Sequence, residues 1–477
     1  MDKHYVMGID NGTQSTKVVI FDWDGNEVAY GMCPLKETFA PEPGMCLHPD
    51  DDLWDSVFYA IQDSLRNFSG DPKSIKGIGL CTIRSCRILL KRDGSLAYPV
   101  MNWMDARLAR PYQHKDDDVK YVTTTSGYIG FRLTGEKNDS AGNYEMNWPL
   151  DRTTWDWSED PEVMKQNGLN RDMLFNLKKP GEKLGLLCTE VAEELGLQKN
   201  IPVVATSNDK SVEVLGAGLN HKKSMVLSLG TYISALIPRD RNYENAINFF
   251  PTLGVRPFQY VYESNGVRRG MWTVSWFKKM IGKELQEQAC SLGITEEDFL
   301  NQEAEKIAPG SEGLITILDW LSTPDKPYRK GIMLGFDEKH SRYHMYRSIL
   351  EAIAYHMKSN VEMMLEEINE NIKEIIVIGG GAKSDLMMQI LSDLFGLPVH
   401  RRNSESGAAL GAAINVYHYL TPNKTIPEIL SEVVKTEKTC YPIYENHLFY
   451  NKVNDDVVKQ IRDSTDQILK YMYPIFG

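Results

Sequence analysis

Two stretches of the chain share one pattern of hydrophobic and polar positions. Residues 5–22 place a short polar turn, residues 11–15, between two apolar runs rich in β-branched side chains. Residues 225–234 repeat this pattern around Gly230 and Thr231. Apolar runs that flank such a turn predict pairs of antiparallel strands. Because one pair opens each half of the chain, the pattern indicates an internally duplicated fold.

Other apolar runs predict strands that alternate with helices. We expect strands at 27–30, 75–80, 201–208 and 375–378, and helices at 50–65, 211–218, 341–367 and 385–395. After about residue 414 the chain is expected to be mainly helical. This order predicts an α/β protein. A chain of 477 residues is too long for one core, so we expect a boundary in the polar stretch 219–223 and domains at 1–219 and 220–477.

Composition narrows the class of protein. The chain is 42% hydrophobic and 25% charged, with a formal net charge of −12. This negative charge argues against a nucleic-acid partner or an anionic membrane surface. No apolar run reaches the roughly 18 residues of a membrane helix, and no signal-peptide core precedes Asp10, so we expect a cytoplasmic protein. The seven cysteines form no Cys-x-x-Cys pair and predict reduced thiols.

The first turn carries candidate chemistry. Asp10 ends a buried strand, where a carboxylate needs a partner, and the residues that follow supply backbone and hydroxyl donors suited to phosphate oxygens. Asp10 is then a candidate site for Mg²⁺ or its water shell. The alternative is an Asx-turn, in which Asp10 and Asn11 only cap their own backbone. No Walker-type phosphate loop occurs in the sequence.

The stretch from Gly8 to Lys17 closely resembles the first phosphate motif of the FGGY carbohydrate kinases. This resemblance implies an α/β fold of two duplicated actin-like, or ribonuclease H-like, ATPase domains with a catalytic cleft between them. It also implies ATP and Mg²⁺ as cofactors. The nucleotide-binding residues that it implies in this turn are Gly12, Thr13, Gln14, Ser15 and Lys17.

Two segments resemble the acceptor pocket of that family. Arg84 lies between two apolar runs and matches the arginine of the glycerol-kinase type of pocket. It is predicted to bind a hydroxyl of the acceptor. The alternative is a surface salt bridge. Trp103 and Asp105 fit the Trp-x-Asp-x-Arg motif. A polyol pocket needs an aromatic face and a carboxylate that accepts hydroxyl hydrogens. The alternative is a packed tryptophan beside an Asp105–Arg107 pair.

Asp209 stands where an apolar strand gives way to a helix of small residues. In the resembled kinases the matching aspartate takes the proton of the attacking hydroxyl, so Asp209 is predicted to be the general base and to share the metal with Asp10. Asn208 is predicted to contact the substrate. A helix N-cap is the alternative for this position. All of the predicted acceptor residues come from the first half.

The second half carries the remaining nucleotide motifs of the resemblance. They are the second phosphate turn, a glycine that opens a helix, and a glycine-rich turn after the strand 375–378, where glycines let a flat ring approach the backbone. The small-residue helix 406–413 is expected to pack behind that last turn. The predicted residues are Gly230, Thr231, Gly270, Gly379, Gly380, Gly381, Ala382 and Ser384.

The function implied is ATP-dependent phosphorylation of a hydroxyl of a small sugar, ketose or polyol, in an enzyme that can form a homodimer. Two alternatives stay open. One is an ATPase of the same fold with a changed acceptor, since a fold does not fix a function. The other is a non-catalytic, ATP-switching actin-like protein, which has no need of Arg84, Trp103 or Asp105.

Overall fold

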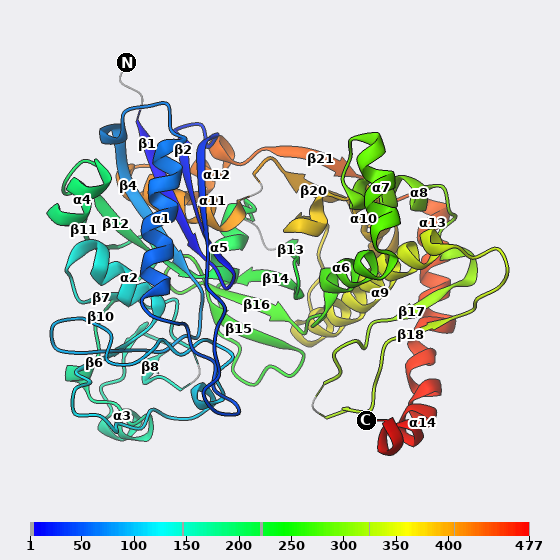
Figure 1. The fold of residues 1–477 in the computed structure, drawn as a ribbon, viewed down its shortest axis with the longest axis horizontal. Helices are drawn as coiled ribbons and strands as arrows, with labels where there is room; N and C mark the ends of the chain where they lie inside the picture. Colours follow the sequence, from blue (N-terminus) through cyan, green and yellow to red (C-terminus); the bar gives the residue numbers. More distant parts are fainter. Residues whose placement is uncertain (1–3, 146, 220–222, 324, 405, 477) are drawn as a thin grey trace.

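The computed structural model describes residues 4–145, 147–219, 223–323, 325–404 and 406–476 (Figure 1). Its first sheet has the strand order β11-β12-β4-β1-β2-β3. The strands β1, β2 and β3 form an antiparallel meander, whereas β4 runs parallel to β1 and β12 parallel to β4. The bounds are β1 (Tyr5–Asn11), β2 (Ser15–Asp22), β3 (Glu27–Pro34), β4 (Ile75–Thr82), β11 (Lys183–Leu186) and β12 (Pro202–Asn208).

The second sheet has the order β15-β16-β14-β13-β19-β20-β21. It repeats the first: β13, β14 and β16 form an antiparallel meander, β19 runs parallel to β13, and β20 runs parallel to β19. The predicted duplication is therefore confirmed. The bounds are β13 (Ser224–Leu229), β14 (Ile233–Arg239), β15 (Phe249–Leu253), β16 (Tyr260–Ser264), β19 (Glu374–Ile378), β20 (Val399–Arg402) and β21 (Thr436–Cys440).

Helices and short strands complete the chain, and the predicted helices are found within a few residues of their expected ends. The helices are α1 (Asp52–Arg66), α2 (Thr125–Thr134), α3 (Pro161–Gln166), α4 (Thr189–Leu195), α5 (Asp209–Gly216), α6 (Gly270–Ile281), α7 (Lys283–Leu292), α8 (Glu296–Glu305), α9 (Arg342–Ile368), α10 (Asp385–Phe395), α11 (Gly407–Leu420), α12 (Ile426–Val433), α13 (Tyr444–Val453) and α14 (Lys459–Phe476). The short strands are β5 (Ile88–Leu90), β6 (Tyr121–Thr123), β7 (Asn138–Ser140), β8 (Leu150–Asp151), β9 (Asp156–Trp157), β10 (Asn176–Lys178), β17 (Ile315–Ile317) and β18 (Ile332–Leu334).

The C-terminal segment is mainly helical, as expected, but β21 adds an unpredicted edge strand to the second sheet. The predicted domain boundary between residues 219 and 220 stays a prediction, because residues 220–222 of the expected linker lie outside the described residues. All seven cysteines are free thiols. No helix within the described ranges is both long enough and apolar enough to cross a membrane.

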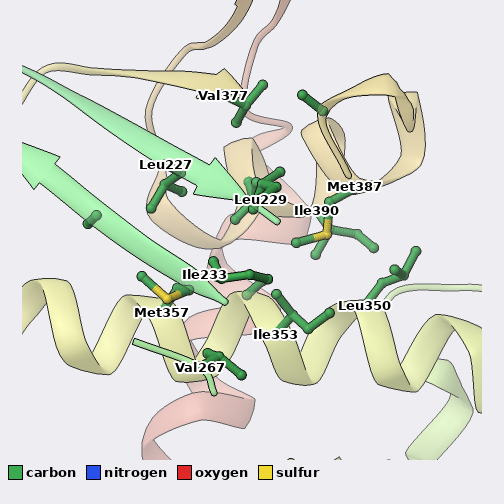
Figure 2. Packing of buried hydrophobic residues seen from close by; sticks show 14 of the residues in the cluster. Leu227, Leu229, Ile233, Val267, Leu350, Ile353, Met357, Val377, Met387 and Ile390 are labelled. Atoms are coloured by element: carbon green, nitrogen blue, oxygen red, sulfur yellow. The ribbon is translucent and has the colours of Figure 1, made fainter. Parts of the chain in front are cut away.

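The second half has a core between its sheet and two helices (Figure 2). Leu227 and Leu229 of β13 and Ile233 of β14 pack against Met357 of α9 and Met387 of α10, and all five side chains are fully buried. A separate core in the first half packs α1 and α2 against the first sheet. Each sheet therefore has its own hydrophobic core.

The small-residue helix α11 lies against the first sheet, not behind the glycine turn of the second, so that expectation was wrong. Figure 1 shows α11, in orange, beside the blue strands β1 and β4. Glycines make this approach close: a Cβ on Gly8 would come 2.0 Å from the carbonyl oxygen of Ala409, and one on Gly79 would come 2.2 Å from that of Ala412. The chain thus returns to the first half before β21 rejoins the second sheet.

Candidate active site

The end of β1 brings Asp10 to the centre of the first sheet. Asp10 stands opposite Lys17 on β2 and Cys81 on β4. The turn that follows is closed by a hydrogen bond from the Gly12 N–H to the Ser15 carbonyl oxygen, at 3.1 Å. Thr13 and Gln14 at its tip are exposed, so the polar groups of the predicted phosphate turn are accessible.

Asp10 lies among charged side chains of both signs. Burial raises the pKa of the Asp10 carboxyl to about 7, and the carboxylates of Glu213 and Asp209 add to this effect. The positive charges of Lys17 and Lys210 oppose it without cancelling it. Asp10 and Asp209 are thus close enough to interact electrostatically, and a cation between them would relieve the repulsion between the carboxylates. That they share a metal ion stays a prediction.

Lys210 and Glu213 belong to this cluster, although the sequence analysis did not select them. Lys210 Nζ lies 3.0 Å from Glu213 Oε2 and donates to Ser228 Oγ at 3.2 Å. Ser228 is on β13, so the first turn of α5 is tied to the second sheet. The spacing in the sequence could have indicated Glu213, because it follows Asp209 by one helical turn and therefore faces the same side of the helix.

Asp209 is the first residue of α5, and its carboxylate is held from two sides. Its Oδ1 accepts a hydrogen bond from the Lys210 N–H at 2.9 Å and lies 3.7 Å from Arg84 Nε. About a quarter of the side chain is exposed, so a substrate hydroxyl has access to it. The N-cap is Asn208, the residue before, whose side chain accepts from the Ser211 N–H.

Asn208 is fully buried, and its amide already has partners. Its Nδ2 donates to Thr252 Oγ1 at 2.6 Å and to the Leu253 carbonyl oxygen at 3.0 Å, both on β15 of the second sheet. This arrangement favours a positioning role for Asn208, in which it fixes the start of α5 and hence Asp209. The predicted substrate contact of Asn208 stays a prediction.

Arg84 lies just after β4 and reaches across to the second sheet. Its Nη2 donates to Glu263 Oε2 at 2.7 Å, and Glu263 Oε1 accepts from Ser234 Oγ at 3.0 Å. Glu263 is on β16, so the predicted acceptor residue Arg84 has its principal partner in the other half. No local pattern in the sequence indicates this pair, because its members are 179 positions apart.

Trp103 and Asp105 have different surroundings. The Trp103 side chain is 49% exposed, and its segment runs beside that of Arg84, because Arg87 and Met101 exchange both backbone hydrogen bonds. Trp103 is therefore exposed close to the Arg84 segment, and its contact with the acceptor stays a prediction.

The Asp105 carboxylate, by contrast, is buried and fully engaged. Its oxygens accept from Arg107 Nε and Nη2, both at 2.8 Å, from the Arg107 N–H at 3.0 Å and from the Cys46 N–H at 2.9 Å. Burial alone would raise its pKa, but these hydrogen bonds with the Arg107 charge lower it. The geometry favours the packed Asp–Arg pair, and a direct substrate contact of Asp105 stays a prediction.

The nucleotide residues predicted in the second half lie around the end of β13. The Gly230 carbonyl oxygen accepts from the Met271 N–H at the start of α6, at 3.2 Å. Gly270 packs on Ile233, where a Cβ would come within 2.3 Å. Gly379 has a positive φ of 85°, and a Cβ there would come 3.0 Å from the backbone of Leu229.

The glycine turn continues into α10. Gly381 and Ala382 are buried, whereas Gly380 is exposed and has open space where a Cβ would be. Ser384 caps α10 by accepting from the Met387 N–H at 3.1 Å. Thr231 of the second turn is also exposed. The three predicted motifs of this half therefore meet at one edge of its sheet, with exposed glycine and hydroxyl positions.

The residues present are compatible with a magnesium ion. Within the described part of the chain, no three His, Cys, Asp or Glu side chains form a preassembled metal site. Mg²⁺ in phosphoryl-transfer enzymes commonly takes only one or two carboxylates and completes its shell with water and substrate phosphates. Asp10 and Asp209 supply two carboxylates within electrostatic range of each other, which fits that chemistry.

Comparison with known proteins agrees with this architecture. Residues 5–119 and 111–216 match the N-terminal domain of the FGGY family of carbohydrate kinases, and residues 274–417 match its C-terminal domain. The chain is 42% identical over 475 residues to the sugar kinase YgcE of Escherichia coli K12, covering 100% of this chain and 96% of that protein.

Solved structures show the same fold. Xylulose kinase from Rhodospirillum rubrum superposes with a TM-score of 0.82 at 18% identity, over 98% of this chain and 100% of that one. Glycerol kinase from Plasmodium falciparum, solved with ADP, superposes with a TM-score of 0.79 at 18% identity, over 96% and 98% of the two chains. The two-domain fold, the matched domains and the sugar-kinase relative together show that this chain is a carbohydrate kinase of the FGGY family.

Proposed function

We propose that this kinase transfers the γ-phosphate of ATP to a hydroxyl of a small sugar, ketose or polyol, with Asp209 as the general base. The observation that carries the proposal is the position of the Asp209 carboxylate. It is partly exposed at the first turn of α5, within electrostatic range of Asp10 and 3.7 Å from Arg84. Phosphoryl transfer depends on positioning and charge stabilisation, and the attacking hydroxyl still has to lose a proton.

The remaining residues have roles that follow from their places. The turn at Gly12 and Thr13 and the turn at Gly230 and Thr231 offer backbone N–H groups and hydroxyls to the phosphates. The glycine turn at 379–381 gives the adenosine a flat backbone surface. Arg84 and Trp103 hold the acceptor.

Asp10 and Asp209 would hold Mg²⁺, which when bound neutralises negative charge on the phosphates. Asn208 fixes the start of α5, and Lys210 and Glu213 tie α5 to β13, so these three side chains keep Asp209 in place. The two solved structures named above are a xylulose kinase and a glycerol kinase, and these names do not decide the acceptor of this chain.

The test is Asp209→Asn, which keeps the shape of the side chain and removes the proton acceptor. ADP release is measured over a panel of sugars, ketoses and polyols, and ATP binding is measured separately by calorimetry. We expect ATP binding to be nearly unchanged and turnover to fall by about a hundredfold to ten-thousandfold. The matched control is Asp117→Asn, at an exposed loop position.

A variant that retains turnover within about threefold of the wild type would remove Asp209 from the role of general base. Absence of acceptor-dependent ADP release in the wild type over the whole panel would instead count against the proposed reaction. It would favour the alternative of an ATPase with a changed acceptor.

A further inference from the structure

Three carboxylates lie near the guanidinium of Arg84. Its guanidinium makes a direct ion pair with Glu263 and a longer one with Asp209. Burial alone would lower the pKa of the guanidinium, but Glu263, Glu145 and Asp209 together raise it. Glu145, which the sequence analysis did not select, is therefore a third carboxylate near this guanidinium. Lys210 also interacts with Asp209 and Glu263, and Arg152 interacts with Glu145.

The loop that carries Glu145 is fixed to the base of the site. Gly142 pairs with Ser207, and its carbonyl oxygen accepts from Ser207 Oγ and Asn208 Nδ2, each at 3.2 Å. Glu145 follows three residues later and is only 9% exposed. The same backbone contact thus positions both Glu145 and Asp209, which come shortly after the two paired residues.

Two polar atoms in this cluster have no partner in the described part of the chain. Arg84 Nη1 and Glu145 Oε1 are both buried and form no hydrogen bond. Buried polar atoms usually have a partner, so such a pair requires an explanation. A single group that contacted both atoms would have to accept from the guanidinium and donate to the carboxylate. A hydroxyl does both, whereas the oxygen of a carboxylate or an ionised phosphate can only accept.

An arginine in an acceptor pocket ordinarily suggests an anionic ligand, because its planar fork matches a carboxylate. Here Glu263 already occupies that part of the guanidinium, through Nη2. Glu145 and Asp209 add two further negative charges with low exposure to solvent. A carboxylate placed directly against the buried Glu145 would meet repulsion that solvent screens poorly.

We infer that Glu145 is a specificity-determining residue that restricts the acceptor to uncharged sugars and polyols and excludes sugar acids. The inference rests on the proposed function, because it concerns the acceptor of the same reaction. Glu145 favours an acceptor hydroxyl that donates a hydrogen bond. Together with Glu263 it prevents a carboxylate of the acceptor from pairing with the Arg84 guanidinium.

Matched pairs of acceptors test this selection in the wild-type enzyme. The probes are glycerol with D-glycerate, xylitol with xylonate, and sorbitol with gluconate, together with ketoses, at saturating Mg-ATP. We expect every acceptor that the enzyme phosphorylates to be an uncharged compound. The aldonates should neither be phosphorylated nor inhibit phosphorylation of the uncharged acceptors. An aldonate used as well as its polyol would overturn the inference and leave the kinase assignment intact. Failure of every compound would remove the proposed function and the inference with it.

Two variants connect the selection to the residues. Glu145→Gln keeps the size of the side chain and removes its charge, and should raise the ratio of aldonate to polyol kcat/KM by about tenfold to a hundredfold. Glu263→Gln releases the guanidinium and should act in the same direction, which keeps the test decisive if one variant fails to fold. Glu159→Gln, at an exposed position, is the matched control. An unchanged ratio in both folded variants would show the inference to be wrong.

Discussion

Replacing Asp10 by asparagine should make the free enzyme more stable above neutral pH. The pKa of Asp10 is raised from 3.8 to about 7, mainly by burial. Each pKa unit corresponds to about 1.4 kcal/mol, so above pH 7 the charged carboxylate destabilises the folded state by about 4 kcal/mol. A carboxyl with a raised pKa binds its proton more tightly in the folded state. Wild-type stability should therefore fall as pH rises from about 4 to about 7, and stay low above that.

Asparagine does not titrate, so the stability of Asp10→Asn should lack this decline. The difference between variant and wild type should grow by about 3 kcal/mol between pH 5 and pH 8.5, because part of the effect is already present at pH 5. Urea unfolding of both proteins at several pH values, in EDTA and without nucleotide, measures it. Asp24→Asn, in the exposed turn between β2 and β3, is the matched control. Parallel pH profiles for wild type and Asp10→Asn would refute the reasoning.

Two further substitutions test parts of the structure separately. Trp103→Ala should raise the KM for the acceptor by about tenfold with little change in kcat, because it removes an exposed stacking face; steady-state kinetics checks this, with the equally exposed neighbour Met104→Ala as control. Gly411→Ala should destabilise the protein by about 1 to 3 kcal/mol, since its Cβ would come 2.1 Å from the Val212 carbonyl oxygen. Gly407→Ala in the same helix meets nothing within 4 Å and should be neutral or stabilising in urea unfolding, so equal effects of the two would contradict the packing of α11.

The fold was predictable to a large extent because its strongest signals are local. Each of the two hairpins, at 5–22 and 225–234, is predicted by two adjacent apolar runs and the turn between them. Both form antiparallel pairs in the structure, β1–β2 and β13–β14. The place of α11 was not predictable in this way. Its small residues indicated close packing, but the glycines that receive it are Gly8 and Gly79, more than three hundred positions earlier in the chain.

In the candidate site, too, local motifs could be predicted from the sequence and long-range contacts could not. Motifs confined to a few neighbouring residues, such as the turn after Asp10 or the glycines at 379–381, could be found in the sequence. Asp105 shows the limit of a motif, because the Trp-x-Asp-x-Arg spacing fits a substrate ligand and a buried ion pair with Arg107 equally well. Only the hydrogen bonds to Arg107 and Cys46 separate the two interpretations.

The pairing of Arg84 with Glu263 changes how the acceptor pocket relates to the two halves. From the sequence, all of the predicted acceptor residues came from the first half, with nucleotide motifs in both. In the structure a 2.7 Å ion pair joins Arg84 to β16 of the second half. Any movement of one half against the other must therefore move or break this buried contact, which is costly when it leaves a charge unpaired. The position of Arg84, and with it the shape of the acceptor pocket, thus depends on how the second half is placed. With Arg84 in its proposed role as an acceptor ligand, domain closure and acceptor recognition would be coupled through one guanidinium.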